Sequence, residues 1–252
     1  MDLSNIPVPP ASQDGPSVPP VGMGKLNVPE KELPDVAPKD FRETMQWRIF
    51  RVMAEFIEGF EFLADFKKSV SIFGSTRDSD ATHKWYEEAR KLGNMLATEG
   101  YAVVTGGGPG IMQAGNQGAA EAGGVSVGLN IQLPREQRVN PYVNRSKGFH
   151  YFFTRKLMLT YAAEAYVYFP GGFGTLDELS EIITLIQTRK IDRIPVILVG
   201  REFWGGFNEW VKKLMFERDA AVDAEDLTIY TIVDTAEEVM EIVRKAPPRD
   251  GF

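Results

Sequence analysis

The chain has 252 residues, of which 43% are hydrophobic and 25% are charged, and its formal net charge of −7 predicts a globular protein with one main domain and accessory segments. The acidic balance argues against a nucleic-acid polymer as partner, because binding one requires a basic face, whereas a small phosphate ligand can be held by backbone N–H groups. The chain has no cysteine and only two histidines, so disulfides, zinc thiolates and a histidine metal cluster are not expected. Without a signal-like start or a membrane-length apolar run, we expect no membrane partner and a cytoplasmic location.

The first 67 residues of the chain predict a tail followed by a helix. Residues 1–38 hold nine of the sixteen prolines and have few aromatic residues, which predicts a disordered Pro-rich tail. Residues 39–67 predict an amphipathic helix, which we expect to pack on the core of its own subunit or, as the alternative, on a second subunit. The expected apolar stripe of this helix is Phe41, Met45, Ile49, Met53, Phe56 and Phe60.

Residues 68–246 predict one α/β domain, and 247–252 a flexible C-terminal end. Short apolar runs of strand length alternate with segments of helical period, and the last helix is opened by a capping box from Thr235 to Glu238. The alternation predicts a doubly wound, Rossmann-like and mostly parallel sheet with helices on both faces. In such sheets ligands bind at the carboxyl ends of the strands. The expected strands are 69–73, 102–105, 125–129, 165–169, 196–199 and 229–233.

Two glycine turns connect expected strands to the helices that follow them. The first is Gly106–Gly110 and the second is Pro170–Thr175. Glycines let backbone N–H groups approach a ligand, and the start of a helix adds unpaired donors and a positive dipole end. Either turn alone is consistent with glycines that only make tight bends. Two of them at strand ends favour an anion-binding cradle.

The known phosphate-binding fingerprints do not fit these turns. The sixth position of a dinucleotide-binding GxGxxG pattern falls on Ile111 in the first turn and on Asp177 in the second. The acidic residue that would hold a ribose hydroxyl at the end of the next strand is replaced by Asn130. A P-loop is also excluded, because Asn116 stands where its lysine would be.

Three longer motifs carry a family resemblance. They are GGGxxGxM at Gly106–Met112, the pair Arg155 and Lys156, and PGGxGTxxE at Pro170–Glu178. With these motifs the chain resembles the LONELY GUY family of cytokinin riboside 5′-monophosphate phosphoribohydrolases, long labelled lysine decarboxylase-like. The resemblance covers residues 69–243.

The resemblance implies hydrolysis of the N-glycosidic bond of a nucleoside 5′-monophosphate of the AMP type, without a cofactor. Such cleavage passes through an oxocarbenium-like state at C1′, which a carboxylate can stabilise, attack or serve by activating water. Glu178 is the catalytic candidate for this role. Arg155, the second catalytic candidate, is expected to hold Glu178 ionised through a charge-assisted pair, although a purely structural salt bridge is the alternative.

The substrate-binding residues follow from the same resemblance. The 5′-phosphate is expected at the two glycine turns, and Ser75 and Met112 are expected to line the nucleoside pocket. The family usually has Met and Tyr where this chain has Phe152 and Phe173, which bears on the shape of the base pocket. The expected set is Ser75, Gly107, Gly108, Gly110, Met112, Glu136, Arg155, Lys156, Gly171, Gly172, Phe173, Gly174, Thr175, Glu178 and Thr184.

Two other functions stay open on the sequence. One is a non-catalytic nucleotide or molybdenum-cofactor-like carrier, because related folds bind that cofactor. The other is a decarboxylase with pyridoxal phosphate on Lys156, which lacks an obvious partner for the pyridinium nitrogen. Family members assemble through helices beside the site, so a homodimer or a larger homo-oligomer is expected.

Overall fold

The structure is a computed structural model that describes residues 44–77, 84–132 and 139–247. These residues belong to one compact unit, Thr44–Phe252. The expectations for the Pro-rich tail, for Glu136 and for 248–252 lie outside the described residues.

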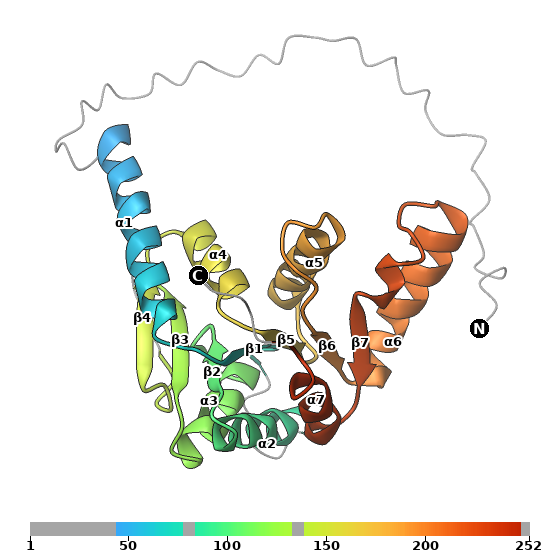
Figure 1. Cartoon of the computed structure of the whole chain (residues 1–252), viewed down its shortest axis with the longest axis horizontal. Helices are drawn as coiled ribbons and strands as arrows, with labels where there is room; N and C mark the ends of the chain where they lie inside the picture. The colour runs from blue at the N-terminus through green and yellow to red at the C-terminus, as the bar shows by residue number, and fades with distance from the viewer. Residues whose placement is uncertain (1–43, 78–83, 133–138, 248–252) are drawn as a thin grey trace, which may run out of the picture. The chain divides into compact units, whose positions relative to one another are not determined.

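Seven parallel strands form a single sheet in the order β4-β3-β2-β1-β5-β6-β7 (Figure 1). In chain order, β1 to β4 are added toward one edge of the sheet, and β5 to β7 are added toward the other edge. The direction therefore reverses between the neighbours β1 and β5. A reversal of this kind opens a crevice at the carboxyl ends of the strands. The strands are β1 Ser69–Phe73, β2 Ala102–Thr105, β3 Ser126–Ile131, β4 Arg145–Phe149, β5 Ala165–Tyr168, β6 Val196–Val199 and β7 Tyr230–Val233.

Helices cover both faces of the sheet, which confirms the doubly wound α/β prediction. Figure 1 shows α2, α3 and α7 on one face and α4, α5 and α6 on the other. The capping box of Thr235 and Glu238 at the start of α7 is also confirmed. Within the described ranges, no helix combines the length and apolarity needed to cross a membrane. The helices are α1 Met45–Ala64, α2 Lys84–Thr98, α3 Ile111–Glu121, α4 Phe152–Tyr161, α5 Phe173–Gln187, α6 Arg201–Trp210, a π-helix Val211–Arg218, a 3-10 helix Asp226–Thr228 and α7 Ala236–Val243.

The strands divide the core into two apolar clusters because alternate side chains point to opposite faces. In β1, Val70 and Ile72 belong to the cluster that includes α2, α3 and α7. Phe73 belongs to the other cluster and stacks on Tyr168 of β5 with ring centroids 4.8 Å apart. The central strands are therefore buried on both faces, which is why they read as continuous apolar runs.

The strand β4 was not among the expected strands. Its sequence, RSKGF, has no apolar run or alternation, and only Phe149 at its end is fully buried. The strand forms because it pairs along its whole length with β3, from Arg145 opposite Val127 to Phe149 opposite Ile131. Its place at the edge of the sheet allows polar side chains.

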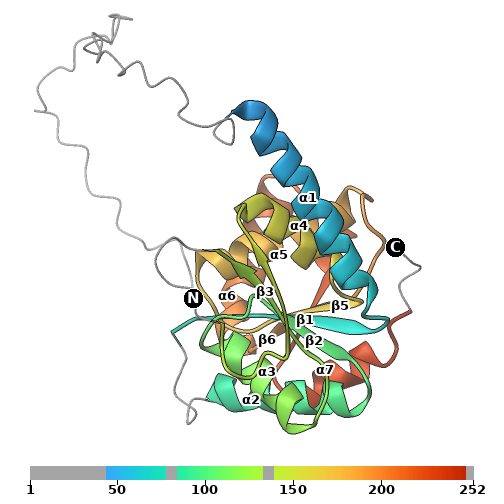
Figure 2. The same ribbon diagram turned by 90° about the vertical axis from the view of Figure 1, so that its left-hand side faces the viewer.

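The N-terminal half of the expected apolar stripe of α1 does not pack on the described core, so the alternative of a second subunit stays a prediction for it. The buried residues of α1 are Glu55, Gly59 and Leu63, and Phe56 and Phe60 pack against the core. Figures 1 and 2 show the N-terminal part of α1 extending past the end of α4, its neighbour, so no part of the described unit covers it. The exposed apolar side chains of α1 are Met45, Trp47, Ile49, Phe50, Met53 and Ile57.

Candidate functional site

Three loops meet at the carboxyl edge of the sheet, where the strand order reverses. The Ser75 N–H after β1 donates to the Pro170 carbonyl after β5 at 3.0 Å, and the Ile111 N–H donates to the Ser75 carbonyl at 3.0 Å. Gly110 has a φ of 71°, and a Cβ there would lie 2.2 Å from the Ser75 oxygen. Only glycine therefore permits this approach. The backbone of Ser75 joins both glycine turns to one another.

The turn after β5 leaves backbone donors open. Gly171 is fixed by close approach, because a Cβ there would lie 2.1 Å from Oγ1 of the buried Thr175. Gly172 and Gly174, in contrast, have nothing within 4 Å of an added Cβ. No side chain caps α5, and in the described part of the chain the N–H groups of Phe173 and Thr175 have no acceptor. Open donors at a helix start form an anion site.

The turn after β2 is held by a buried polar network. The Gly107 N–H donates to Oγ1 of Thr105 at 2.9 Å, and the Gly107 carbonyl accepts the N–H of Asn140 at 2.9 Å. Nδ2 of Asn140 donates both to the Gly108 carbonyl at 3.1 Å and to Oδ1 of Asn116 at 2.9 Å. Asn116 and Asn140 were not among the expected residues, and no spacing in the sequence connects them. They fix the shape of the turn.

Arg155 of α4 reaches the same turn. A Cβ on Gly106 would lie 3.3 Å from Nη2 of Arg155 and 2.9 Å from Sδ of Met112, so both side chains cover this glycine. The guanidinium lies 5.5 Å from the ring centroid of Phe152. Burial lowers the pKa of Arg155 below its ordinary value, and the negative charge of Glu178 acts in the opposite direction.

Glu178 lies in the second turn of α5, half-buried beside Arg155 and Lys156. Burial raises the pKa of this carboxyl to about 7, against the opposing effect of the positive charges on Lys156 and Arg155. No ion pair joins Arg155 directly to Glu178 among the described residues, so the two interact through space. The expected direct pair between Arg155 and Glu178 is therefore absent from the described contacts, and burial has a larger effect on the pKa of Glu178 than the attraction of Arg155.

Lys156 makes two ion pairs with α5. Its Nζ lies 2.8 Å from Oδ2 of Asp177 and 3.1 Å from Oε2 of Glu181. Burial lowers the pKa of Lys156, but the bonds to Asp177 and Glu181 outweigh this effect and raise it above its ordinary value. Neither Asp177 nor Glu181 was among the expected site residues, although the spacing of three residues places Glu181 on the same helix face as Glu178.

The remaining expected residues lie at varying distances from this cluster. Ser75 belongs to the joined loops, and its Oγ accepts the N–H of Arg77 at 3.1 Å. Phe173 is 91% exposed. Thr184 is exposed on α5, and its hydroxyl donates to the Ser180 carbonyl at 2.7 Å, so the described contacts connect it to no other residue of the set. No group of three His, Cys, Asp or Glu among the described residues is placed to hold a metal ion.

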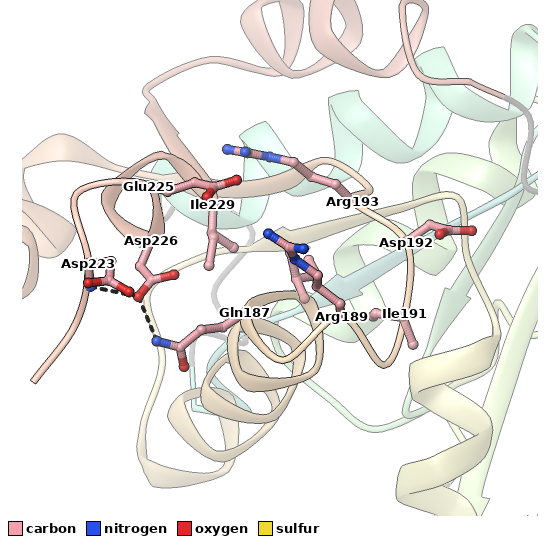
Figure 3. Close-up of a pocket in the computed structure, with 10 residues that line it drawn as sticks. Gln187, Arg189, Ile191, Asp192, Arg193, Asp223, Glu225, Asp226 and Ile229 are labelled. Atoms are coloured by element: carbon pink, nitrogen blue, oxygen red, sulfur yellow. Dashed lines mark hydrogen bonds between the residues drawn. The ribbon is translucent and has the colours of Figure 1, made fainter.

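A separate cavity of about 380 Å³ lies near the amino ends of β6 and β7, away from the carboxyl ends of the strands (Figure 3). It is enclosed by the end of α5 and the segments that precede β6 and β7. Arg189 and Arg193 face Asp223 and Asp226 across it, and Gln187 donates to Asp226 at 2.6 Å. None of the expected residues described in the structure lines this cavity, so it is not part of the candidate site.

Comparisons with known proteins agree with the fold and the motifs. A family model described as "Possible lysine decarboxylase" matches residues 112–243. The cytokinin riboside 5′-monophosphate phosphoribohydrolase LOG of Oryza sativa subsp. japonica is 30% identical over 170 residues, which are 65% of this chain and 68% of that protein.

Two solved structures are similar to the described fold. An X-ray structure from a structural genomics consortium is 28% identical, with a TM-score of 0.53 over 71% of this chain and 99% of the other. The molybdenum cofactor binding protein of Rippkaea orientalis is 23% identical, with a TM-score of 0.54 over 71% of this chain and 96% of that one. At this lower identity the second likeness shows the fold alone.

Proposed function

This chain belongs to the LONELY GUY family of phosphoribohydrolases, whose family model is described as possible lysine decarboxylase, and we propose that it hydrolyses the N-glycosidic bond of nucleoside 5′-monophosphates. The observation that carries the proposal is the half-buried Glu178, with a pKa raised to about 7, beside an open backbone cradle. A general acid or base is most effective when its pKa lies near the working pH.

The cradle supports a 5′-phosphate as the anchoring group of the substrate. The open N–H groups at the start of α5 and the hydroxyl of Thr175 are donors of the kind that phosphate oxygens accept. Arg155 lies beside the neighbouring turn and adds a positive charge. With a phosphate bound there, we expect the attached ribose to lie between the glycine turns and Glu178.

Glu178 then performs the proton transfer of the reaction. The C1′–N bond breaks, a C1′–O bond forms to water, and one water proton ends on the released base. With a pKa of about 7, Glu178 can donate its proton to the departing base, and the carboxylate that this leaves can accept a proton from the attacking water, which restores the starting state. Its ionised form also stabilises positive charge at C1′.

The other functions have less support. A Schiff-base lysine must lose its proton, whereas Asp177 and Glu181 raise the pKa of Lys156 and favour the ammonium form. The residues present therefore do not fit pyridoxal phosphate at Lys156. A molybdenum-cofactor carrier needs no acid with a pKa near 7, and the likeness to such a protein is one of fold.

The proposal is tested by incubating the full chain with a panel of nucleosides and nucleotides and measuring ribose 5-phosphate. The panel contains AMP, other purine monophosphates, isopentenyladenosine 5′-monophosphate and adenosine. Each charge-assisted hydrogen bond to the phosphate contributes about 1.5–3 kcal/mol, so kcat/KM should fall on the order of a hundredfold or more without the phosphate. Binding of nucleotides without any release of ribose 5-phosphate would instead favour a carrier, and equal rates on AMP and adenosine would contradict the cradle.

A further inference from the structure

Helix α4 carries two charged residues of the candidate site but has no cap of its own. Its N-cap residue is Tyr151, whose side chain makes no capping hydrogen bond. Arg155 and Lys156 follow within the next two turns. Unsatisfied N–H groups at a helix start favour fraying of the first turn. Some other group must therefore hold this end of α4.

Glu55 of α1 supplies one half of a cap, because it accepts the N–H groups of the N-cap residue and of the residue before it. Its Oε1 accepts the N–H of His150 at 2.8 Å, and its Oε2 accepts the N–H of Tyr151 at 3.3 Å. The same Oε2 accepts the hydroxyl of Thr154 at 2.6 Å. Glu55 is only 8% exposed, and two backbone N–H groups donate to it, while the hydroxyl of Thr154 lies within hydrogen-bond distance of both Glu55 and the Tyr151 carbonyl. A negative charge at a helix N-terminus is also favoured by the helix dipole.

The arrangement resembles a capping box whose carboxylate comes from another helix. In a capping box the third helical residue is Glu or Gln, and its side chain accepts the N–H of the N-cap residue. The third residue of α4 is Thr154, which is too short for that contact. Glu55 supplies the carboxylate from α1, and Thr154 donates to it.

Helix α1 packs closely on α4, and this packing fixes the position of Glu55. Gly59, one turn after Glu55, lies so close to α4 that a Cβ there would be 2.6 Å from Sδ of Met158. Glu58 of α1 also pairs with Lys147 of β4. These contacts fix the position of Glu55 relative to the end of α4.

We propose that Glu55 is a positioning residue for the candidate site: it caps α4 and thereby holds Arg155 against the turn at Gly106 and Lys156 against the carboxylates of α5. The inference rests on the proposed function for its effect on turnover. Its effect on the start of α4 is independent of that function and can be measured separately.

The first test compares Glu55→Ala with Leu63→Ala in the full chain. Both remove a buried side chain of α1, but Leu63 lies two turns away from the cap. The assay is run well below the melting temperature of each variant. We expect Glu55→Ala to lower kcat/KM for AMP by about tenfold to a hundredfold, because small displacements of charged groups have effects of this size. Leu63→Ala should change kcat/KM by less than about twofold even where it lowers the melting temperature as much or more.

A second measurement does not depend on activity. Amide hydrogen exchange in Glu55→Ala should become about tenfold faster or more within 150–155, at the N–H groups of His150, Tyr151 and Arg155 that have acceptors, while amides of β1 and β5 keep their protection. In Leu63→Ala the same amides should exchange as in the unchanged chain. Equal exchange at 150–155 in Glu55→Ala and in the unchanged chain would overturn the inference.

A rescue variant tests the capping mechanism itself. In Glu55→Ala/Thr154→Glu the carboxylate moves to the third residue of α4, from which it can reach the Tyr151 N–H as in an ordinary capping box. We expect this variant to regain slow exchange at 150–155 and at least part of the lost kcat/KM. Should the double variant fail to fold, the exchange result for Glu55→Ala decides. If the unchanged chain hydrolyses no nucleotide, the proposed function is wrong, and the exchange measurement still tests the cap. If the unchanged chain and Glu55→Ala hydrolyse AMP with equal kcat/KM, the positioning role is wrong.

Discussion

At the scale of single residues, the protonation of Glu178 governs what the candidate site can do. Burial raises its pKa to about 7 although Lys156 and Arg155 lie near it. A carboxyl placed in this way costs stability when it is ionised, because the folded state desolvates its charge. Function and stability are therefore expected to oppose one another at this position.

The stability of the protein should reveal this conflict through its pH dependence. The pKa of Glu178 rises from 4.5 to about 7 on folding, so the favourable effect of its protonated form is complete below 4.5 and is lost as the pH rises through 7. Glu178→Gln should raise the free energy of unfolding at pH 8 by about 2 kcal/mol, allowing for partial exposure. Thermal melts at pH 8 and pH 4.5 should show a gain at the higher pH that disappears at the lower. A gain that is independent of pH would contradict the raised pKa.

A second prediction at this scale concerns Gly174. An added Cβ has nothing within 4 Å, so Gly174→Ala should leave the fold intact or slightly more stable, because alanine favours a helix. The methyl group would stand beside the donors proposed for phosphate and should raise KM for AMP about tenfold or more with little change in kcat. Gly205→Ala in α6, which is equally open, is the matched control and should leave KM unchanged. An unchanged KM in Gly174→Ala would remove this glycine from the phosphate cradle.

At the scale of elements, the site depends on turns that are held by side chains from elsewhere in the chain. Asn140 connects the segment before β4 to the glycine turn after β2, through Gly108 and Asn116. Losing this buried amide leaves the Gly108 carbonyl without its side-chain donor, while Oδ1 of Asn116 keeps only the hydroxyl of Thr105 at 2.7 Å. The turn should then become less well defined.

Asn140→Ala should therefore lower both stability and substrate binding. We expect a loss of about 1–3 kcal/mol in the free energy of unfolding and a rise of about tenfold in KM for AMP. Asn144→Ala is the control, because the exposed side chain of Asn144 makes two hydrogen bonds, with Ser126 and Gly124, at the amino end of β3 and away from the turn. Denaturant unfolding and steady-state kinetics check both variants. A comparable rise in KM in Asn144→Ala would show that general destabilisation, and not the turn, is responsible.

Elements with a strong local signal could be predicted from the sequence. The strands β1, β2 and β5 are apolar runs because they are buried on both faces, and the turns that follow them contain the glycines that close backbone approach requires. The edge strand β4 has polar residues and gave no signal. In α1, apolar residues recur at helical spacing on more than one face of the helix. Only the packing of α1 on α4 determines which face is buried.

The electrostatics of the site could not be predicted, because it depends on tertiary burial. The sequence places Arg155 and Glu178 in one site but contains nothing that says whether burial or attraction dominates the pKa. Likewise, Lys156 meets Asp177 and Glu181 only because α4 and α5 lie side by side. The role of Glu55, distant in sequence from every motif, is visible only in the fold.

At the scale of the whole molecule, several large apolar side chains of α1 are exposed in the described unit. Phe50 is 63% exposed, and Phe152 and Phe153 at the start of α4 are also exposed. Contiguous apolar surface of this kind marks interaction sites. We propose that a second copy of the chain covers it, in a homodimer or a larger homo-oligomer.

Light scattering should accordingly show at least a dimer at micromolar concentration. Phe50→Asp should shift the mass toward the monomer, because an ionised carboxylate is costly to bury in an apolar interface. Its effect on the fold of each chain should be small, since Phe50 packs on nothing in its own core. A monomeric mass for the unchanged chain would contradict the proposal.

The central claim is that one site at the reversal of the strand order both binds a nucleoside 5′-monophosphate and cleaves its glycosidic bond through Glu178. It is tested most directly by measuring ribose 5-phosphate release from AMP in the unchanged chain and in Glu178→Gln, together with AMP binding by calorimetry. The account predicts that kcat falls by roughly 10²–10⁴ while the Kd for AMP changes by less than about tenfold. Full turnover by Glu178→Gln would contradict it, and so would AMP binding by the unchanged chain without any release of ribose 5-phosphate.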